Sequence, residues 1–182
     1  IEKNSILDIY MRDAPPESGI AAIMVDAYEK KGPTIVRGNR LNVRSAHGIA
    51  IRGHADRRPS FEIYDNEISV QEPYFPFAFT SQNVTNTLIR NNHTRGGRAG
   101  LWVQRPCCQP ANVEFHDNDI RDVSAPVVTA QTLSGGLRVY SNSFCLKGAV
   151  DAGQNSAVPN NTFSGNCPPP IQITPPSNLF VR

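Results

Sequence analysis

An eight-residue pattern with a fixed asparagine recurs along the whole chain. It reads apolar, any, apolar, any, any, Asn, any, apolar, and is clearest at residues 61–68, 113–120 and 137–144. With its weaker copies it forms a series of seven asparagines, at positions 4, 39, 66, 92, 118, 142 and 161. Their separations are 35, 27, 26, 26, 24 and 19 residues. Internal periodicity of this kind indicates a stack of repeated structural units.

A second apolar segment lies between successive copies, as at residues 23–25, 77–79 and 100–103. Both segments alternate with period two and end at Gly, Asn or Pro, as short β-strands do. No segment of a dozen residues has the apolar spacing of a helix. One unit cannot bury its apolar face alone, whereas coils stacked about 4.8 Å apart form a continuous core. We therefore predict an all-β fold, a single-stranded right-handed parallel β-helix (solenoid) of about six to seven coils.

The repeated asparagines are expected to form a ladder at one corner of the coils. Asn tolerates the left-handed backbone region, which suits a tight corner. Its side-chain amide can also bond to the Asn of the coils above and below. Such a ladder satisfies polar groups that would otherwise be buried without partners at the turn.

The repeat resembles that of the right-handed parallel β-helix superfamily, over residues 1 to about 163. Its members include pectate and alginate lyases, polygalacturonases, mannuronan epimerases, phage tailspikes and periplasmic β-helix proteins linked to copper-enzyme maturation. The resemblance implies an exported protein, secreted, periplasmic or at the cell surface, that handles a polysaccharide. Two functions stay open: a polysaccharide lyase or glycoside hydrolase acting on an acidic glycan, and a non-catalytic glycan-binding or structural module. The repeat specifies coils and not chemistry.

Charge and hydropathy exclude two classes of partner. The formal net charge is +2, from 18 basic and 16 acidic residues. These charges are interspersed without a Lys/Arg block, so we expect no nucleic-acid partner. No run of about 18 apolar residues occurs, so we expect no membrane span.

The two ends of the chain differ from the repeat. Residues 1–166 form the coils, and the Pro-rich residues 167–182 are expected to cover the last coil, because proline cannot donate to a strand ladder. Ile1 already lies within a coil, and solenoids need capped ends. We therefore expect a missing segment or another chain to cover the first coil. A tailspike-like module would be a homotrimer, as the resemblance implies.

Four cysteines, at positions 107, 108, 145 and 167, fit no zinc-binding spacing. One interpretation is one or two disulfides in an oxidising compartment, with Cys145–Cys167 as a candidate pair across neighbouring coils. The alternative is buried or idle thiols, since free Cys often acts as a small core residue.

Period-two alternation places two columns of side chains on one outer face. The residues two positions before the ladder asparagines are Arg37, Tyr64, Arg90, His116 and Tyr140. The residues four positions before are Ile35, Glu62, Leu88, Glu114 and Arg138. The simplest interpretation is a solvated sheet face with cation–π contacts and modest ion pairs.

The second apolar segment of each coil has its own outer face, on which we place the candidate site. Trp102 is the single tryptophan, and an exposed indole can stack on a sugar ring. Neighbouring arginines would suit a uronate carboxylate. Alternatively, Trp102 packs beneath the loop at residues 105–111. The catalytic candidates are Arg52, His54 and Asp56, and the substrate-binding candidates are Asp26, Trp102, Gln104 and Arg105.

Two reactions are compatible with such a face. Lyases and epimerases remove the proton alpha to a uronate carboxyl group, for which His54 or Arg52 would be the base and Asp26 or Asp56 a partner. Hydrolases need two carboxylates flanking one sugar bond, but Asp26, Asp56 and Asp151 are several coils apart. No intact catalytic motif of the polygalacturonases or epimerases is present. We expect no metal site and no cofactor, with Ca²⁺ as the one option for a lyase.

Overall fold

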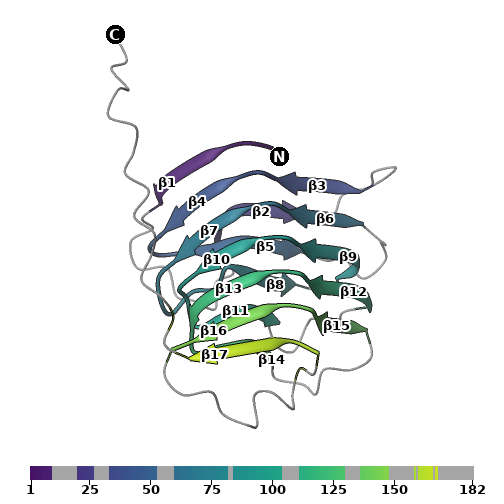
Figure 1. The fold of residues 1–182 in the computed structure, drawn as a ribbon. Helices are drawn as coiled ribbons and strands as arrows, with labels where there is room; N and C mark the ends of the chain where they lie inside the picture. The colour runs from purple at the N-terminus through teal and green to yellow at the C-terminus, as the bar shows by residue number, and fades with distance from the viewer. Residues whose placement is uncertain are drawn as a thin grey trace.

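The computed structural model describes residues 1–9, 20–26, 33–52, 60–81, 84–103, 111–129, 136–147, 158, 160–165 and 167. These residues form 17 strands, and no helix, in three parallel sheets (Figure 1). The first sheet, called here the ladder sheet, has 7 strands in the order β1-β4-β7-β10-β13-β16-β17. Its strands are β1 (Ser5–Ile9), β4 (Arg40–Val43), β7 (Glu67–Val70), β10 (His93–Arg95), β13 (Asp119–Val123), β16 (Ser143–Leu146) and β17 (Thr162–Gly165).

The other two sheets have 5 strands each. The column sheet, in the order β15-β12-β9-β6-β3, consists of β3 (Thr34–Arg37), β6 (Phe61–Tyr64), β9 (Thr85–Arg90), β12 (Ala111–His116) and β15 (Leu137–Tyr140). The indole sheet, in the order β14-β11-β8-β5-β2, consists of β2 (Ala21–Asp26), β5 (His47–Arg52), β8 (Phe77–Ser81), β11 (Ala99–Val103) and β14 (Ala125–Thr129).

The chain visits the three sheets in turn, so the predicted β-solenoid is confirmed. Four turns, β3-β4-β5, β6-β7-β8, β9-β10-β11 and β12-β13-β14, are described with all three strands. Strands β1, β2, β15, β16 and β17 belong to turns described only in part. The expected six to seven coils therefore exceed the four turns that are complete in the described part of the chain, because the first and last turns are described only in part.

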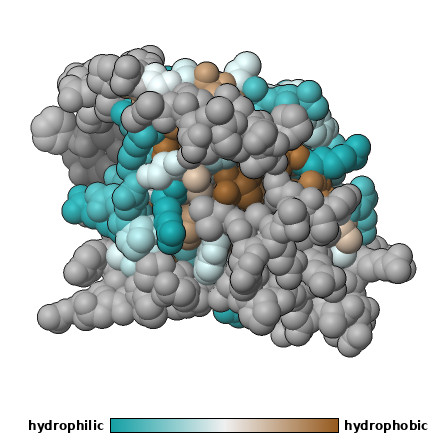
Figure 2. All heavy atoms as spheres, turned by 90° about the horizontal axis from the view of Figure 1, so that it is seen from below, coloured by the Kyte–Doolittle hydropathy of each residue, from teal (hydrophilic) through white to brown (hydrophobic). Residues whose placement is uncertain are grey.

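The core is a set of apolar columns that run from coil to coil. In the column sheet, Val36, Ile63, Ile89 and Phe115 are in register and each is 0% exposed. Full burial of each such side chain contributes about 1.5–3 kcal/mol relative to exposure. Seen from the end where β14, β15 and β17 lie, apolar surface (brown) shows in the middle and hydrophilic surface (teal) towards the sides (Figure 2). The outward faces of the three sheets are thus the places for polar chemistry.

The asparagine ladder is also confirmed. Each ladder Asn from Asn4 to Asn142 donates from Nδ2 to Oδ1 of the next ladder Asn along the chain, at 2.8–2.9 Å. The same Oδ1 accepts the backbone N–H of the donor residue at 2.9–3.1 Å. In the middle of the stack Asn66, Asn92 and Asn118 are no more than 2% exposed. In the middle of the stack each side-chain amide therefore satisfies several polar groups that water cannot reach.

The expectation that the ladder asparagines adopt the left-handed conformation at this corner was wrong. The left-handed conformation belongs to the residue before each ladder Asn, with φ between 52° and 66°: Lys3, Gly38, Asp65, Asn91, Asp117, Ser141 and Asn160. The preceding residue makes the turn, and the ladder Asn remains free to direct its amide along the stack. Asn is required here for its side-chain hydrogen bonds, and not because it tolerates a left-handed backbone conformation.

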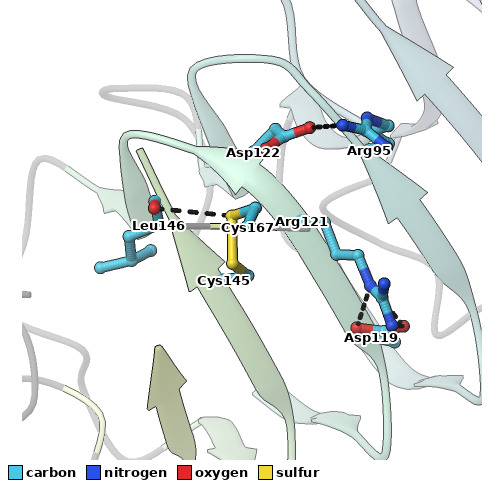
Figure 3. Close-up of a disulfide and its surroundings, with 7 residues drawn as sticks. All are labelled: Arg95, Asp119, Arg121, Asp122, Cys145, Leu146 and Cys167. Atoms are coloured by element: carbon cyan, nitrogen blue, oxygen red, sulfur yellow. Dashed lines mark hydrogen bonds and ion pairs between the residues drawn. A yellow bond between two sulfur atoms is a disulfide. The ribbon is translucent and has the colours of Figure 1, made fainter. Parts of the chain in front are cut away.

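A disulfide joins Cys145 of β16 to Cys167, with an S–S distance of 2.17 Å and a Cα–Cα distance of 5.5 Å (Figure 3). The predicted pair is therefore confirmed. Cys145 is in register with Arg121 on one side and Ser164 on the other. Cys107, Cys108 and the predicted capping residues 168–182 lie outside the described residues. Among those that are described, no helix is long and apolar enough to cross a bilayer.

Candidate functional site

Trp102 lies on the outer face of the indole sheet. Its chain neighbours Leu101 and Val103 are in the core, at 0% and 5% exposure, so alternation directs the indole outward. Its register partner is Ala78 on β8, and Ala78 in turn pairs with Ala50 on β5. Both alanines are 0% exposed although they are on the outer face. Small side chains there leave space for a large ring to lie across the neighbouring strands.

The indole is held in a cluster of rings, named here the aromatic cluster: His47, Tyr74, Phe75 and Trp102. Phe75 stacks on Trp102 with ring centroids 5.2 Å apart and an interplanar angle of 13°. His47 is also 5.2 Å from the indole, and it is 0% exposed. Its Nδ1 accepts the backbone N–H of Phe75 at 3.1 Å, which places the ring proton on Nε2. Trp102 is consequently half-buried, with one ring face packed and part of the indole accessible.

Sequence reasoning missed His47, Tyr74 and Phe75 as partners of the tryptophan. They occupy no repeated position, and only the aromatic pair just before β8 could have indicated them. Of the predicted site residues, Arg52 is exposed at the end of β5, where its backbone pairs with those of Asp26 and Ser81. His54, Asp56, Gln104 and Arg105 lie outside the described residues. The groove therefore remains a prediction: of its residues the structure describes only Trp102, Arg52 and the backbone of Asp26.

The outer face of the column sheet carries the second candidate surface, called here the arginine–tyrosine column: Arg37, Tyr64, Arg90, His116 and Tyr140. These residues are in register across β3, β6, β9, β12 and β15. The guanidinium of Arg90 lies over the Tyr64 ring, 4.5 Å from its centroid. Arg37 approaches the same tyrosine and donates from Nη1 to its hydroxyl at 3.1 Å. Tyr64 therefore has a cation on either side.

The other half of the column is organised around Glu114. His116 stacks on Tyr140 at 4.9 Å with an interplanar angle of 7°. The Tyr140 hydroxyl donates to Glu114 Oε2 at 2.6 Å, and Arg138 forms an ion pair with the other carboxylate oxygen. The Tyr140 hydrogen bond, followed by the charge of Arg138, lowers the pKa of Glu114 below its usual value. The same hydrogen bond raises the pKa of Tyr140. His116 Nδ1 lies 2.6 Å from Asp117 Oδ2.

The cations of this face differ in their partners. Arg37 pairs with Glu2 at 3.0 Å, and Arg138 pairs with Glu114. Within the described part of the chain, Arg90 contacts the Tyr64 ring and forms no ion pair with a carboxylate. It is half-buried, so its guanidinium is partly desolvated and held by the stack. This arrangement leaves one oriented cation available to an anion from solution.

The ladder sheet has a different outer surface, in which opposite charges neutralise one another. Arg121 Nη2 lies 2.8 Å from Asp119 Oδ2, and Arg95 forms an ion pair with Asp122 (Figure 3). Arg40 Nε lies 3.4 Å from Glu67. Such ion pairs, the first within β13 and the other two between neighbouring strands, are typical of a solvated sheet face. Among the described residues no group of three or more His, Cys, Asp or Glu could hold a metal ion.

Comparison of the chain with family models, with curated proteins and with solved structures gives no match. Two outward surfaces of this parallel β-solenoid, the aromatic cluster and the arginine–tyrosine column, are therefore the candidates for its function.

Proposed function

We propose that this chain is an exported β-helix protein, of the pectate-lyase-like type that its repeat resembles, and that it binds an acidic polysaccharide on the arginine–tyrosine column. The observation that supports the proposal is the position of the Arg90 guanidinium. Its guanidinium is fixed over Tyr64 at 4.5 Å and has no carboxylate partner among the described residues. An oriented guanidinium binds a carboxylate through two parallel hydrogen bonds, which suits a uronate.

The dimensions of the column suit a chain of sugars better than a single small molecule. Its five residues are on five adjacent strands, which span about 19 Å at about 4.8 Å per strand. Tyr64, His116 and Tyr140 are half-buried, so each ring is held in place while part of it stays accessible. Rings with one apolar face and a polar edge are suited to contact with carbohydrate.

The aromatic cluster is proposed as a second glycan contact. The accessible part of the Trp102 indole is fixed by Phe75 and His47, so little side-chain entropy is lost on binding. Arg52, exposed on the same outer face, would bind a carboxylate there. The predicted roles of His54, Asp56, Gln104, Arg105 and Asp26 belong to this proposal.

Export is proposed from the chemistry of the disulfide. Cys145–Cys167 would not persist in a reducing cytosol, whereas secreted, cell-surface and periplasmic proteins keep such bonds. An acidic polysaccharide would be met in these same compartments.

The experiment measures binding to polygalacturonate, alginate, chondroitin sulfate and a neutral glucan, by affinity electrophoresis and calorimetry at low and moderate salt. We expect the acidic glycans to bind and the neutral one not to. Arg90→Gln should weaken binding at least tenfold, because the bidentate contact is lost. Arg40→Gln is the matched control, since Arg40 is an exposed arginine of the ladder sheet already paired with Glu67. Equal loss in both variants would refute a specific role for Arg90.

Failure of all four polysaccharides to bind would leave the structural module, such as a tailspike-like segment, as the better function. Light scattering of the purified chain then separates the two, because the structural module is expected to be a homotrimer. Trp102→Ala, tested in the same assay, reports on the second surface. Loss of binding in that variant alone would move the glycan site to the aromatic cluster.

A further inference from the structure

The tripeptide Asn-x-Ser/Thr occurs in the chain at three positions, Asn83, Asn92 and Asn160. In an exported protein this tripeptide, with any residue except proline in the middle, is an acceptor for N-linked oligosaccharides. An acceptor that keeps its sugar in the folded protein has to lie on the surface. Asn83 lies outside the described residues, so the structure distinguishes between Asn92 and Asn160.

Asn92 is enclosed in the asparagine ladder. It is 0% exposed, and its Nδ2 donates to Asn118 Oδ1 and to the backbone carbonyls of Ile63 and Arg90. An oligosaccharide on that nitrogen would replace one of its two hydrogens, and it needs space that a fully buried side chain does not have. A chain that carries a sugar at Asn92 therefore cannot close the ladder.

Asn160 lies at the surface of the same corner. It is exposed, and it makes the left-handed turn before the last ladder residue, with φ +66°. Its backbone oxygen accepts the N–H of Ser141 at 2.6 Å, which fixes the turn. Its side-chain amide forms no hydrogen bond with the described part of the chain. The amide nitrogen can therefore carry a substituent without the loss of a contact.

The other two residues of this tripeptide are compatible with that role. Asn161 directs its amide along the stack, where it accepts from Asn142 Nδ2 at 2.8 Å and donates to the Val139 carbonyl at 3.1 Å. Thr162, which supplies the hydroxyl that the tripeptide requires, is exposed at the start of β17. The acceptor amide and the hydroxyl are thus both accessible, whereas the residue between them is held in the ladder.

We propose that Asn160, and not Asn92, is the acceptor of an N-linked oligosaccharide. The amide nitrogen of Asn160 forms a bond to the anomeric carbon of an oligosaccharide carried on a lipid diphosphate. The bond from that carbon to the phosphate oxygen breaks, the lipid diphosphate leaves with the electron pair, and the amide gives up one proton to solvent. This inference rests on the proposed export, because a chain meets the lipid-linked donor during export.

The test produces the full chain behind a cleavable secretion leader in eukaryotic cells and collects it from the medium. Peptide N-glycosidase in heavy-oxygen water converts each glycosylated asparagine to a labelled aspartate, and peptide mass spectrometry reads the three tripeptides separately. We expect the label at Asn160 and none at Asn92. A secreted chain without label at Asn160, or with label at Asn92, would overturn the inference while the proposed export stands. Failure of the Cys145–Cys167 bond to form would overturn both.

Variants of the tripeptide separate an acceptor from a merely exposed turn. Asn160→Asp, which retains a residue that tolerates the left-handed turn, and Thr162→Ala should each abolish the sugar on this peptide. Thr162→Ser keeps the hydroxyl and should retain the sugar. Asn91→Asp is the matched control, because Asn91 is exposed with φ +52° at the same corner but begins no acceptor tripeptide. Circular dichroism checks that each variant folds.

Thr94→Val removes the other tripeptide. Thr94 is 3% exposed, and its Oγ1 has no hydrogen-bond partner within the described residues, so valine can replace it without leaving a polar group unsatisfied. The variant should fold and carry the same sugar mass as the parent. Loss of sugar in Thr94→Val, or sugar retained on the Asn160 peptide in Thr162→Ala, would overturn the assignment.

Discussion

Asn92, in the middle of the ladder, is the residue whose truncation should be most informative about stability. It is 0% exposed, and its Oδ1 accepts both the backbone N–H and the Nδ2 of Asn66, at 3.0 and 2.9 Å. Its Nδ2 donates to Asn118 Oδ1 at 2.9 Å and to two backbone carbonyls, of Ile63 and Arg90, at 3.1 and 2.9 Å. Asn92→Ala removes all five hydrogen bonds.

The loss of stability in Asn92→Ala depends on which buried polar groups are left without a hydrogen-bond partner. The Nδ2 of Asn66 keeps the carbonyls of Val36 and Tyr64, whereas its backbone N–H loses its acceptor at a buried corner. A buried donor left unsatisfied costs about 1–3 kcal/mol, and each ordinary hydrogen bond contributes about 1 kcal/mol net. Because the Asn92 amide itself no longer has to be desolvated, the terms do not simply add. We expect Asn92→Ala to lower the free energy of unfolding by about 3 kcal/mol.

Asn4, at the exposed end of the same ladder, is the matched control. Its Nδ2 makes the same bond to Asn39 Oδ1, at 2.9 Å, but the residue is exposed and water can replace the lost amide. Asn4→Ala should therefore cost less than about 1 kcal/mol. Urea unfolding followed by the fluorescence of Trp102, the single tryptophan, measures both variants with an unchanged slope. Losses for the two variants that agree within about 0.5 kcal/mol would refute the argument from buried unsatisfied groups.

Three other predictions concern the column, the disulfide and one glycine. Because the folded pKa of Glu114 is depressed below 4.5, its contacts stabilise the fold above that pH, and this contribution is lost as the pH falls through the folded pKa. The difference in urea midpoint between the parent and Tyr140→Phe should accordingly be larger at pH 7 than at about pH 3. Replacing Cys145 and Cys167 together by Ser should destabilise the chain by about 3 kcal/mol, the entropic effect of closing a 22-residue loop, as measured by urea unfolding. Gly96→Ala should cost more than about 2 kcal/mol, because φ is +75° and a Cβ would lie 2.3 Å from a backbone oxygen of the preceding coil.

Each of these three has a comparison that can contradict it. A Tyr140→Phe difference that stays constant from pH 7 to about pH 3 would exclude the Glu114 carboxylate as its cause. Adding reductant to the parent should reproduce the Cys145/Cys167 double variant, and no change on reduction would mean that the bond does not stabilise the fold. Gly38→Ala shares the left-handed backbone, with φ +63°, but its nearest contact is a flexible side chain at 3.5 Å. Equal losses at Gly38 and Gly96 would rule out the steric clash.

The column of Glu62, Leu88 and Glu114 shows how far position in the repeat could be used. Counting back from the ladder asparagines already aligned Glu62, Leu88 and Glu114 in one outward column, and the observed register agrees. The acidic residues weighed as a hydrolase pair, Asp26, Asp56 and Asp151, were nevertheless those of another face. The sequence did not indicate the hydrogen bond between Tyr140 and Glu114, which joins β15 to β12 through residues 26 positions apart.

The periodic spacing by itself determined the solenoid, the ladder and the inward and outward columns. It could do so because each coil repeats the same local conformation, and stacking at a constant distance turns sequence register into spatial register. Only the tertiary structure decided the aromatic cluster and the position of the left-handed turn. His47, Phe75 and Trp102 meet because loops and strand ends of three coils converge. Such contacts do not recur at a fixed spacing, so the repeat does not predict them. The turn precedes the ladder Asn because that amide must point along the stack, a requirement set by the neighbouring coils.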